Sequence, residues 1–136
     1  MIIGYTTGVF DLFHIGHLNM LRNSKAMCDK LIVGVSTDIL VKKSKNKSPT
    51  IPFKERMEIV KSVRYVDCVV PQENKNKLEA WKKLKFDLMF VGDDWYGDNN
   101  WKKYEEQLKV HGVKIIYFPY TKNVSSTIIQ KKLERI

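Results

Sequence analysis

Short apolar runs, separated by amphipathic stretches, recur along the whole chain. They lie at Ile2–Thr7, Leu31–Ser36, Asp67–Pro71, Asp87–Gly92 and Val113–Pro119. Several are almost continuously apolar, such as LIVGV and LMFVG, which is typical of parallel strands covered on both faces. Between these runs, apolar residues at helical spacing predict helices over Gly16–Cys28, Phe53–Val63 and Asn100–His111, and a last helix after Ser125.

The alternation of strands and helices predicts an α/β fold: a Rossmann-like, doubly wound, five-stranded parallel sheet with helices on both faces. The 136 residues suit a single domain, 1–136. Right-handed crossovers place the loops that leave the strands along one rim, where such sheets bind ligands. These loops are expected at 8–15, 37–52, 72–76, 92–99 and 120–125. Mutually repelling lysines and two prolines indicate that 42–52 is a mobile segment.

Two of the three histidines fall in the first of these loops, in the stretch GVFDLFHIGH. His14 and His17 are three residues apart at the start of a predicted helix, so they lie on the same side of its first turn. Gly16 lets a ligand approach the backbone, and the helix N-terminus adds N–H groups and a positive dipole end. This combination favours a phosphate site. A structural histidine pair and a zinc site are the alternatives, but the other histidine and the cysteines are scattered.

The net charge of +9, from 24 basic and 15 acidic residues, favours an anionic ligand. Phosphates and nucleic acid both qualify, but the chain has no basic-aromatic repeat or nucleic-acid reader motif, so no nucleic-acid partner is expected. No apolar run approaches the roughly 18–20 residues that span a bilayer, so no membrane partner is expected either. The N-terminus lacks the basic start of a signal peptide, and a cytoplasmic location is expected.

The opening stretch resembles the (G/T)xFDxxHxGH signature of the nucleotidylyltransferase superfamily. Four further motifs follow in order: VSTD at 35–38, KERMEIVKSVRYVD at 54–67, GDDW at 92–95 and YTKNVSST at 120–127. The set covers nearly the whole chain and is similar to the small glycerol-3-phosphate cytidylyltransferases. The chain departs from the commonest family pattern twice. Tyr120 stands where relatives have arginine, and Asn123 stands where they have glycine.

The resemblance implies a reaction. The phosphate of a small phosphomonoester, sn-glycerol 3-phosphate in this family, attacks the α-phosphate of CTP in line, giving a CDP-linked compound for a cell-surface polymer and releasing pyrophosphate. His14, His17 and Lys45 are the catalytic residues that it implies, with the imidazoles hydrogen-bonded to phosphates in the transition state. Mg²⁺ would be carried on the CTP phosphates without protein ligands. Such a transfer mainly needs two polyanions brought together and the developing charge stabilised.

The resemblance also assigns binding residues. Nucleotide contacts are implied for Gly8, Val9, Phe10, Gly16, Lys47, Arg64, Gly92, Asp93, Asp94, Tyr120, Thr121, Ser125, Ser126 and Thr127, and acceptor contacts for Asp11, Lys45 and Lys77. The two aspartates of GDDW would repel a triphosphate, so they are expected on the base and ribose. Ser125 is expected to cap the last helix, and the hydroxyls after it form a second anion site.

Some assignments stay open. Aligning the family motif backward from Arg56 places its lysine pair at Lys45 and Lys47. Aligning it forward from Asp38 shifts the pair by one residue, so Lys43 is an alternative for one of the two positions. A basic loop here would close over two anions and exclude water.

Arg64 could contact the nucleotide, lie at the interface of the homodimer that the resemblance implies, or pair with Asp67. Other acceptors, such as phosphocholine or phosphoethanolamine, and ATP in place of CTP are enzymatic alternatives. A nucleotide-sensing module is the non-enzymatic one.

Overall fold

Five parallel strands form one sheet with the spatial order β3-β2-β1-β4-β5. The computed structural model describes residues 1–121 and 125–134, so Asn123 lies outside the described residues. The strands are β1 (Ile3–Gly8), β2 (Lys30–Ser36), β3 (Cys68–Gln72), β4 (Leu88–Gly92) and β5 (Lys114–Phe118). Each lies within one or two residues of an apolar run in the sequence, which confirms the predicted parallel sheet.

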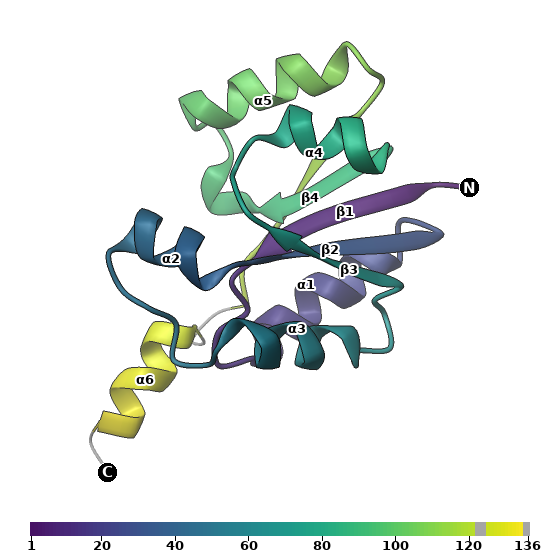
Figure 1. Ribbon diagram of the computed structural model, residues 1–136. Coiled ribbons are helices and arrows are strands. Elements are labelled where there is room, and N and C mark those ends of the chain that lie inside the picture. Colours follow the sequence, from purple (N-terminus) through teal and green to yellow (C-terminus); the bar gives the residue numbers. More distant parts are fainter. Residues whose placement is uncertain (122–124, 135–136) are drawn as a thin grey trace.

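Helices cover both faces of this sheet. In Figure 1, α1 (Ile15–Lys25) and α3 (Phe53–Lys61) lie below it, while α4 (Lys77–Leu84) and α5 (Asn99–Lys109) lie above it. The carboxyl ends of the strands point toward α2 (Asp38–Lys45) and α6 (Ser126–Glu134). The doubly wound architecture is therefore confirmed, and the strand order reverses between β1 and β4, where open α/β sheets bind ligands.

The period-two alternation of the strands builds a separate core on each face. Tyr5, Ile32 and Met89 pack with Trp101 and other apolar residues of the α4–α5 layer. Their neighbours along the strands, including Val33 and Phe90, face the opposite way and pack with the α1–α3 layer. Because every central strand has a buried side chain on both faces, the strands read as continuously apolar in the sequence.

Two helices were not predicted from the apolar pattern. The segment 38–45, expected as part of a loop, is α2, which Thr37 caps by accepting a hydrogen bond from the Leu40 amide at 3.2 Å. It ends at Asn46, whose left-handed backbone suits an asparagine. The second is α4, capped by Asn76. Both are short and rich in lysine, so caps define them better than hydrophobic periodicity does.

A fully buried guanidinium ties together the segments that leave β1 and β2. Arg56 of α3 is 0% exposed, and its NH1 group donates to the carbonyl oxygens of Val9 and Ser36, both at 2.7 Å. Its Nε donates to the carbonyl of Ile51 at 2.9 Å, and NH2 pairs with the Asp38 carboxylate at 2.7 Å. Arg56 thus fixes the exits of two adjacent strands and the segment before α3.

Within the described ranges, no helix is both long and apolar enough to cross a membrane.

We expect Arg56→Leu to lower the free energy of unfolding by about 3 kcal/mol or more, because three carbonyls and a carboxylate lose their donor. Arg56→Lys keeps the charge but cannot span the same acceptors, so its loss should be intermediate. The matched control is Lys54→Leu, which replaces an exposed cation on the same helix and should change stability by less than about 0.5 kcal/mol. Urea denaturation measures all three, and equal stability of Arg56→Leu and wild type would contradict the prediction.

Candidate functional site

The loop between β1 and α1 turns sharply through two left-handed residues. Phe10 and Leu12 have φ of 55° and 48°, a conformation that costs energy for side chains of this size. Phe10 folds back over the end of β1, and a Cβ at Gly8 would lie 2.9 Å from its ring. Gly8 therefore accommodates the turn.

The two histidines cap α1 reciprocally. His14 precedes the helix, and its Nδ1 accepts a hydrogen bond from the Gly16 amide at 3.1 Å. His17 reaches back, and its Nδ1 accepts from the His14 amide at 3.2 Å. The rings stack with their centroids 3.8 Å apart. The sequence predicted unpaired N–H groups at this helix start, but two of its amides, those of His14 and Gly16, donate to the imidazoles themselves.

This capping determines which ring nitrogen can act on a ligand. Because both Nδ1 atoms are acceptors, each neutral imidazole carries its proton on Nε2, and the Nε2–H group remains as a donor. Burial lowers the pKa of His14. Burial, with a contribution from neighbouring His14, lowers the pKa of His17 to about 4, although Asp11 opposes the shift. Both rings are therefore neutral hydrogen-bond donors at neutral pH.

A cavity of about 230 Å³ opens beside His17 at the carboxyl ends of β1 and β2. It brings together eight residues that the sequence analysis assigned to the site: Val9, Phe10, Asp11, His17, Lys45, Lys47, Ser126 and Thr127. Lys43 does not line it. The cavity joins two lysines, the first turn of α6 and a neutral imidazole, an arrangement that can bind phosphate groups and stabilise developing negative charge.

Asp11 and Ser126 hold the walls of this cavity together. The two Asp11 carboxylate oxygens accept hydrogen bonds from the Thr50 and Ile51 amides, both at 2.8 Å. The Ser126 hydroxyl donates to the Asp11 carbonyl. Asp11 was assigned to the acceptor, but its carboxylate is already engaged in anchoring the segment that follows the lysines.

Ser125 caps α6 as predicted, by accepting a hydrogen bond from the Ile128 amide at 3.0 Å.

A second group of assigned residues lies across the strand-order reversal, at the ends of β4 and β5. Tyr120 lies against Gly92, where a Cβ would come 2.8 Å from its ring. Burial and the neighbouring Asp94 and Asp93 carboxylates raise the pKa of Tyr120 to about 12, so its hydroxyl is uncharged. The Thr121 hydroxyl accepts a hydrogen bond from the Asn19 side chain at 2.9 Å, which joins this segment to α1.

Arg64 and Lys77 do not join the cavity in this chain. Arg64 precedes β3, so it lies at the edge where the strands begin, opposite the site, and it donates to the Tyr65 hydroxyl at 2.7 Å. It does not pair with Asp67, which binds Lys25 at 2.6 Å. Lys77 is buried in the α4–α5 layer, with its Nζ 5.4 Å from the centroid of the Trp101 ring, and burial lowers its pKa to about 8.

The comparisons with known proteins agree with this geometry. A family model described as cytidylyltransferase-like matches residues 5–132. The chain belongs to this cytidylyltransferase-like family. It is 35% identical over 130 residues to the glycerol-3-phosphate cytidylyltransferase of Bacillus spizizenii, covering 94% of each chain. It is also 38% identical over 132 residues to the FAD synthase of Pyrococcus abyssi, covering 95% of this chain and 88% of that protein. The predicted resemblance is confirmed, and this cytidylyltransferase-like chain is a nucleotidyltransferase.

A solved structure supports the fold of the cytidylyltransferase-like chain. The lipopolysaccharide core biosynthesis protein from Thermoplasma volcanium GSS1 superposes with a TM-score of 0.74 at 24% identity, covering 91% of this chain and 99% of that one.

Arg56 fixes the backbone of the nucleotidyltransferase site, a role that was not predicted for it from the sequence. One signal was present. Arg56 lies three residues after Phe53 and four before Val60, on the apolar side of the predicted helix. An arginine at such a position is buried, and a buried arginine requires several acceptors around it. Ser48, Thr50 and Gln130 also line the cavity and were not predicted.

No group of three or more histidines, cysteines, aspartates or glutamates that could hold a metal ion occurs among the described residues. The one carboxylate in the wall of the cavity, that of Asp11, is engaged by two backbone amides. The donor set therefore fits a cation that is carried by a phosphorylated ligand better than one held by the protein alone.

The low pKa of His17 predicts a pH dependence of stability. An unfolded chain protonates this histidine below about pH 6.5, whereas the folded chain does so only near pH 4. The free energy of unfolding should therefore fall as the pH falls from 6.5 to 4. His17→Gln keeps an acceptor at this capping position and does not titrate, so it should show a smaller fall in urea titrations. Parallel curves for the two proteins would contradict the pKa shift.

Proposed function

We propose that the chain transfers a cytidylyl group from CTP to a small phosphomonoester and releases pyrophosphate, with sn-glycerol 3-phosphate as the acceptor that the sequence resemblance indicates. One observation carries the proposal. The neutral His17 imidazole lines a cavity together with Lys45, Lys47 and the first turn of α6. The neutral His14 imidazole stacks on it, and the start of α1 holds both rings through Nδ1. This is a constellation for stabilising phosphate charge rather than for forming a covalent intermediate.

In the proposed reaction, an oxygen of the acceptor phosphate forms a bond to the α-phosphorus as the bond from that phosphorus to the β-phosphate oxygen breaks. His14 and His17 donate from Nε2 to phosphoryl oxygens, and neither needs to gain or lose a proton. Lys45 and Lys47 bring the two polyanions together against their mutual repulsion. Mg²⁺ carried by the nucleotide would offset further negative charge during the transfer.

The nucleoside is proposed to lie toward the ends of β4 and β5. Asp94 offers acceptors for an amino group or ribose hydroxyls, and the Tyr120 ring against Gly92 provides a flat surface beside it. Tyr120 cannot supply the positive charge that an arginine would bring at this position.

A homodimer is also proposed, because the family resemblance implies one. Exposed Arg64, at the edge of the sheet away from the site, is the proposed interface residue. The proposed CDP-linked product would serve a cell-surface polymer.

A second candidate is adenylyl transfer from ATP to flavin mononucleotide. The relatives named FAD synthase favour it, with identities of 38% and 36% to the proteins from Pyrococcus abyssi and Pyrococcus horikoshii. The chemistry at phosphorus is the same in both candidates, so the same imidazoles and lysines would serve. Only the nucleobase and the headgroup of the acceptor differ.

Pyrophosphate release over a matrix of four nucleotides and a panel of phosphomonoesters separates these candidates. Release with CTP and glycerol 3-phosphate alone supports the first, and release with ATP and flavin mononucleotide supports the second. Release with CTP and phosphocholine or phosphoethanolamine would retain the chemistry and change the acceptor. Nucleotide binding without release from any pair would replace the proposed enzyme by a nucleotide-sensing module.

We expect His14→Asn to lower turnover about 100-fold or more, because asparagine keeps the helix cap but removes the Nε2–H donor. Thermal melting should show that the variant folds as the wild type does. The control is His111→Asn, which changes an exposed histidine that stacks on Trp81 outside the site. Near-normal turnover of His14→Asn with its best substrate pair would show that the imidazole does not act on phosphate.

Lys43 and Lys45 are both candidates for the family's phosphate-binding lysine, but only Lys45 lines the cavity. Lys45→Ala removes a cation from the cavity wall and should lower kcat/KM by about 10- to 100-fold. Lys43→Ala changes an equally charged residue of the same helix that does not line the cavity, so kcat/KM should change by less than about twofold. Equal losses would indicate that the whole basic segment acts through its net charge.

A further inference from the structure

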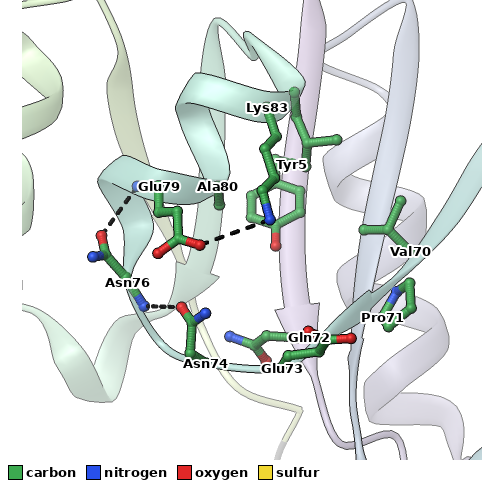
Figure 2. A pocket seen from close by; sticks show the side chains of 11 residues that line it. Tyr5, Val70, Pro71, Gln72, Glu73, Asn74, Asn76, Glu79, Ala80 and Lys83 are labelled. Atoms are coloured by element: carbon green, nitrogen blue, oxygen red, sulfur yellow. Dashed lines mark hydrogen bonds and ion pairs between the residues drawn. The ribbon is translucent and has the colours of Figure 1, made fainter.

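A second cavity, of about 310 Å³, lies between β3 and α4. Figure 2 shows its side chains arranged around one opening: Tyr5 from β1, Gln72 at the end of β3, Asn74 in the loop after it, and Asn76, Glu79 and Lys83 at α4. It shares none of its lining residues with the cavity beside His17. Its volume lies within the range of about 300–1,000 Å³ that is typical of small-molecule sites.

The Tyr5 hydroxyl is the first sign that this cavity binds a ligand. Tyr5 is 3% exposed and lies in the middle of the sheet. The Tyr5 hydroxyl makes no hydrogen bond to a described residue. Every fully enclosed side-chain nitrogen or oxygen of the described residues has a hydrogen-bond partner, so the Tyr5 oxygen is not fully enclosed. The hydroxyl is therefore reached from the cavity that Tyr5 lines. Gly34 makes room for it, since a Cβ there would lie 2.7 Å from the Tyr5 oxygen. Phenylalanine would fill the same core without burying a polar group.

The side-chain amides around the opening are the second sign. The Gln72 oxygen accepts from the Ser36 hydroxyl at 2.8 Å. The Asn74 oxygen accepts from the Asn76 amide at 2.9 Å, and the Asn76 oxygen accepts from the Glu79 amide at 3.0 Å. All three oxygens are thus engaged, while the three NH₂ groups have no acceptor among the described residues. The rim of the cavity consequently offers amide donors beside the Glu73 and Glu79 carboxylates, and Glu79 pairs with Lys83 at 3.7 Å. It matches a ligand whose edge carries acceptors and a donor.

The walls of the cavity define the shape of that ligand. Val70 of β3 lies on the sheet side, and Ala80 and Leu84 of α4 lie on the helix side. Two apolar walls with donors along the rim suit a flat ring system, which would place its faces against the walls and its polar edge toward the amides.

This cavity and the phosphate site share one edge of the sheet. Gln72 pairs in register with Ser36, and the register of β1 with β2 places Val9 level with Ser36. Two strand spacings, about 10 Å, therefore separate Val9 from Gln72. Hydrogen bonds link the two sites. The Ser36 hydroxyl donates to the Gln72 side chain, and the Arg56 guanidinium donates to the carbonyls of both Ser36 and Val9.

We propose that this cavity binds the headgroup of the acceptor: a flat heterocycle with carbonyl oxygens or ring nitrogens at its edge, joined to the reacting phosphate by a chain of about 10 Å. The inference rests on the proposed nucleotidyl transfer, and of its two acceptors it favours flavin mononucleotide. Glycerol 3-phosphate has no part that would fill the cavity.

The test measures binding of riboflavin, which has the ring system but no phosphate, and of flavin mononucleotide by fluorescence quenching without nucleotide. Tyr5→Phe removes only the hydroxyl. Asn76→Asp keeps the cap of α4 and replaces the NH₂ donor by an acceptor. Each should weaken riboflavin binding roughly 3- to 10-fold. Tyr104→Phe, the same change in a partly buried residue of α5 outside the cavity, should leave binding unchanged.

Turnover separates this inference from the proposed function. With flavin mononucleotide as acceptor, Tyr5→Phe and Asn76→Asp should raise KM and change kcat little, because they act away from the reacting phosphorus. Pyrophosphate release that is insensitive to both variants, or wild-type protein that binds neither flavin, would overturn the cavity assignment and leave the reaction standing. Flavin binding that depends on both residues without pyrophosphate release from any pair would retain the cavity and reject the reaction.

Discussion

The reciprocal capping of α1 by two imidazoles is the interaction on which the site depends. A helix start needs acceptors for its first amides, and here His14 and His17 provide them through Nδ1. The same bonds select the tautomer with a proton on Nε2. They fix the His17 ring in the wall of the cavity, with the His14 ring stacked on it. One local hydrogen-bonding requirement therefore stabilises the helix, orients the rings and sets their protonation. Burial reinforces this arrangement by keeping both rings neutral, so that each Nδ1 can accept from a backbone amide while Nε2–H remains a donor.

The backbone around these rings is held by two charged side chains whose polar atoms are already engaged within the protein. Arg56 joins the exits of β1 and β2, and Asp11 fastens the segment after the lysines to the loop before α1. Because Arg56 and Asp11 hydrogen-bond mainly to backbone groups, they are positioning residues and do not contact phosphate. The strained turn at Phe10 and Leu12 persists because these bonds and the packing of Phe10 hold it in place.

The sequence predicted the sheet, four of the helices and the surroundings of His17, because these depend on periodicity and on residues that come together along one edge. It failed where tertiary contacts decide. The lysine-rich segment after Asp38 forms a helix because caps outweigh its charge repulsion. Lys77 turns into the α4–α5 layer, with its Nζ over the Trp101 ring, although an acceptor contact was predicted for it. Arg64 lies at the edge where the strands begin, so of its three interpretations the nucleotide contact does not fit its position. Nothing in the pattern of β1 distinguishes Tyr5 from any other buried aromatic residue, so the cavity beneath α4 is visible only in three dimensions.

The contact between Ser126 and Asp11 joins positions 115 residues apart. The imidazoles and their strained turn therefore precede the opposite wall of the cavity, which belongs to α6, by more than a hundred residues. Until α6 has been synthesised and docked, the histidines lie beside an open surface. The cavity can be enclosed only after that contact forms.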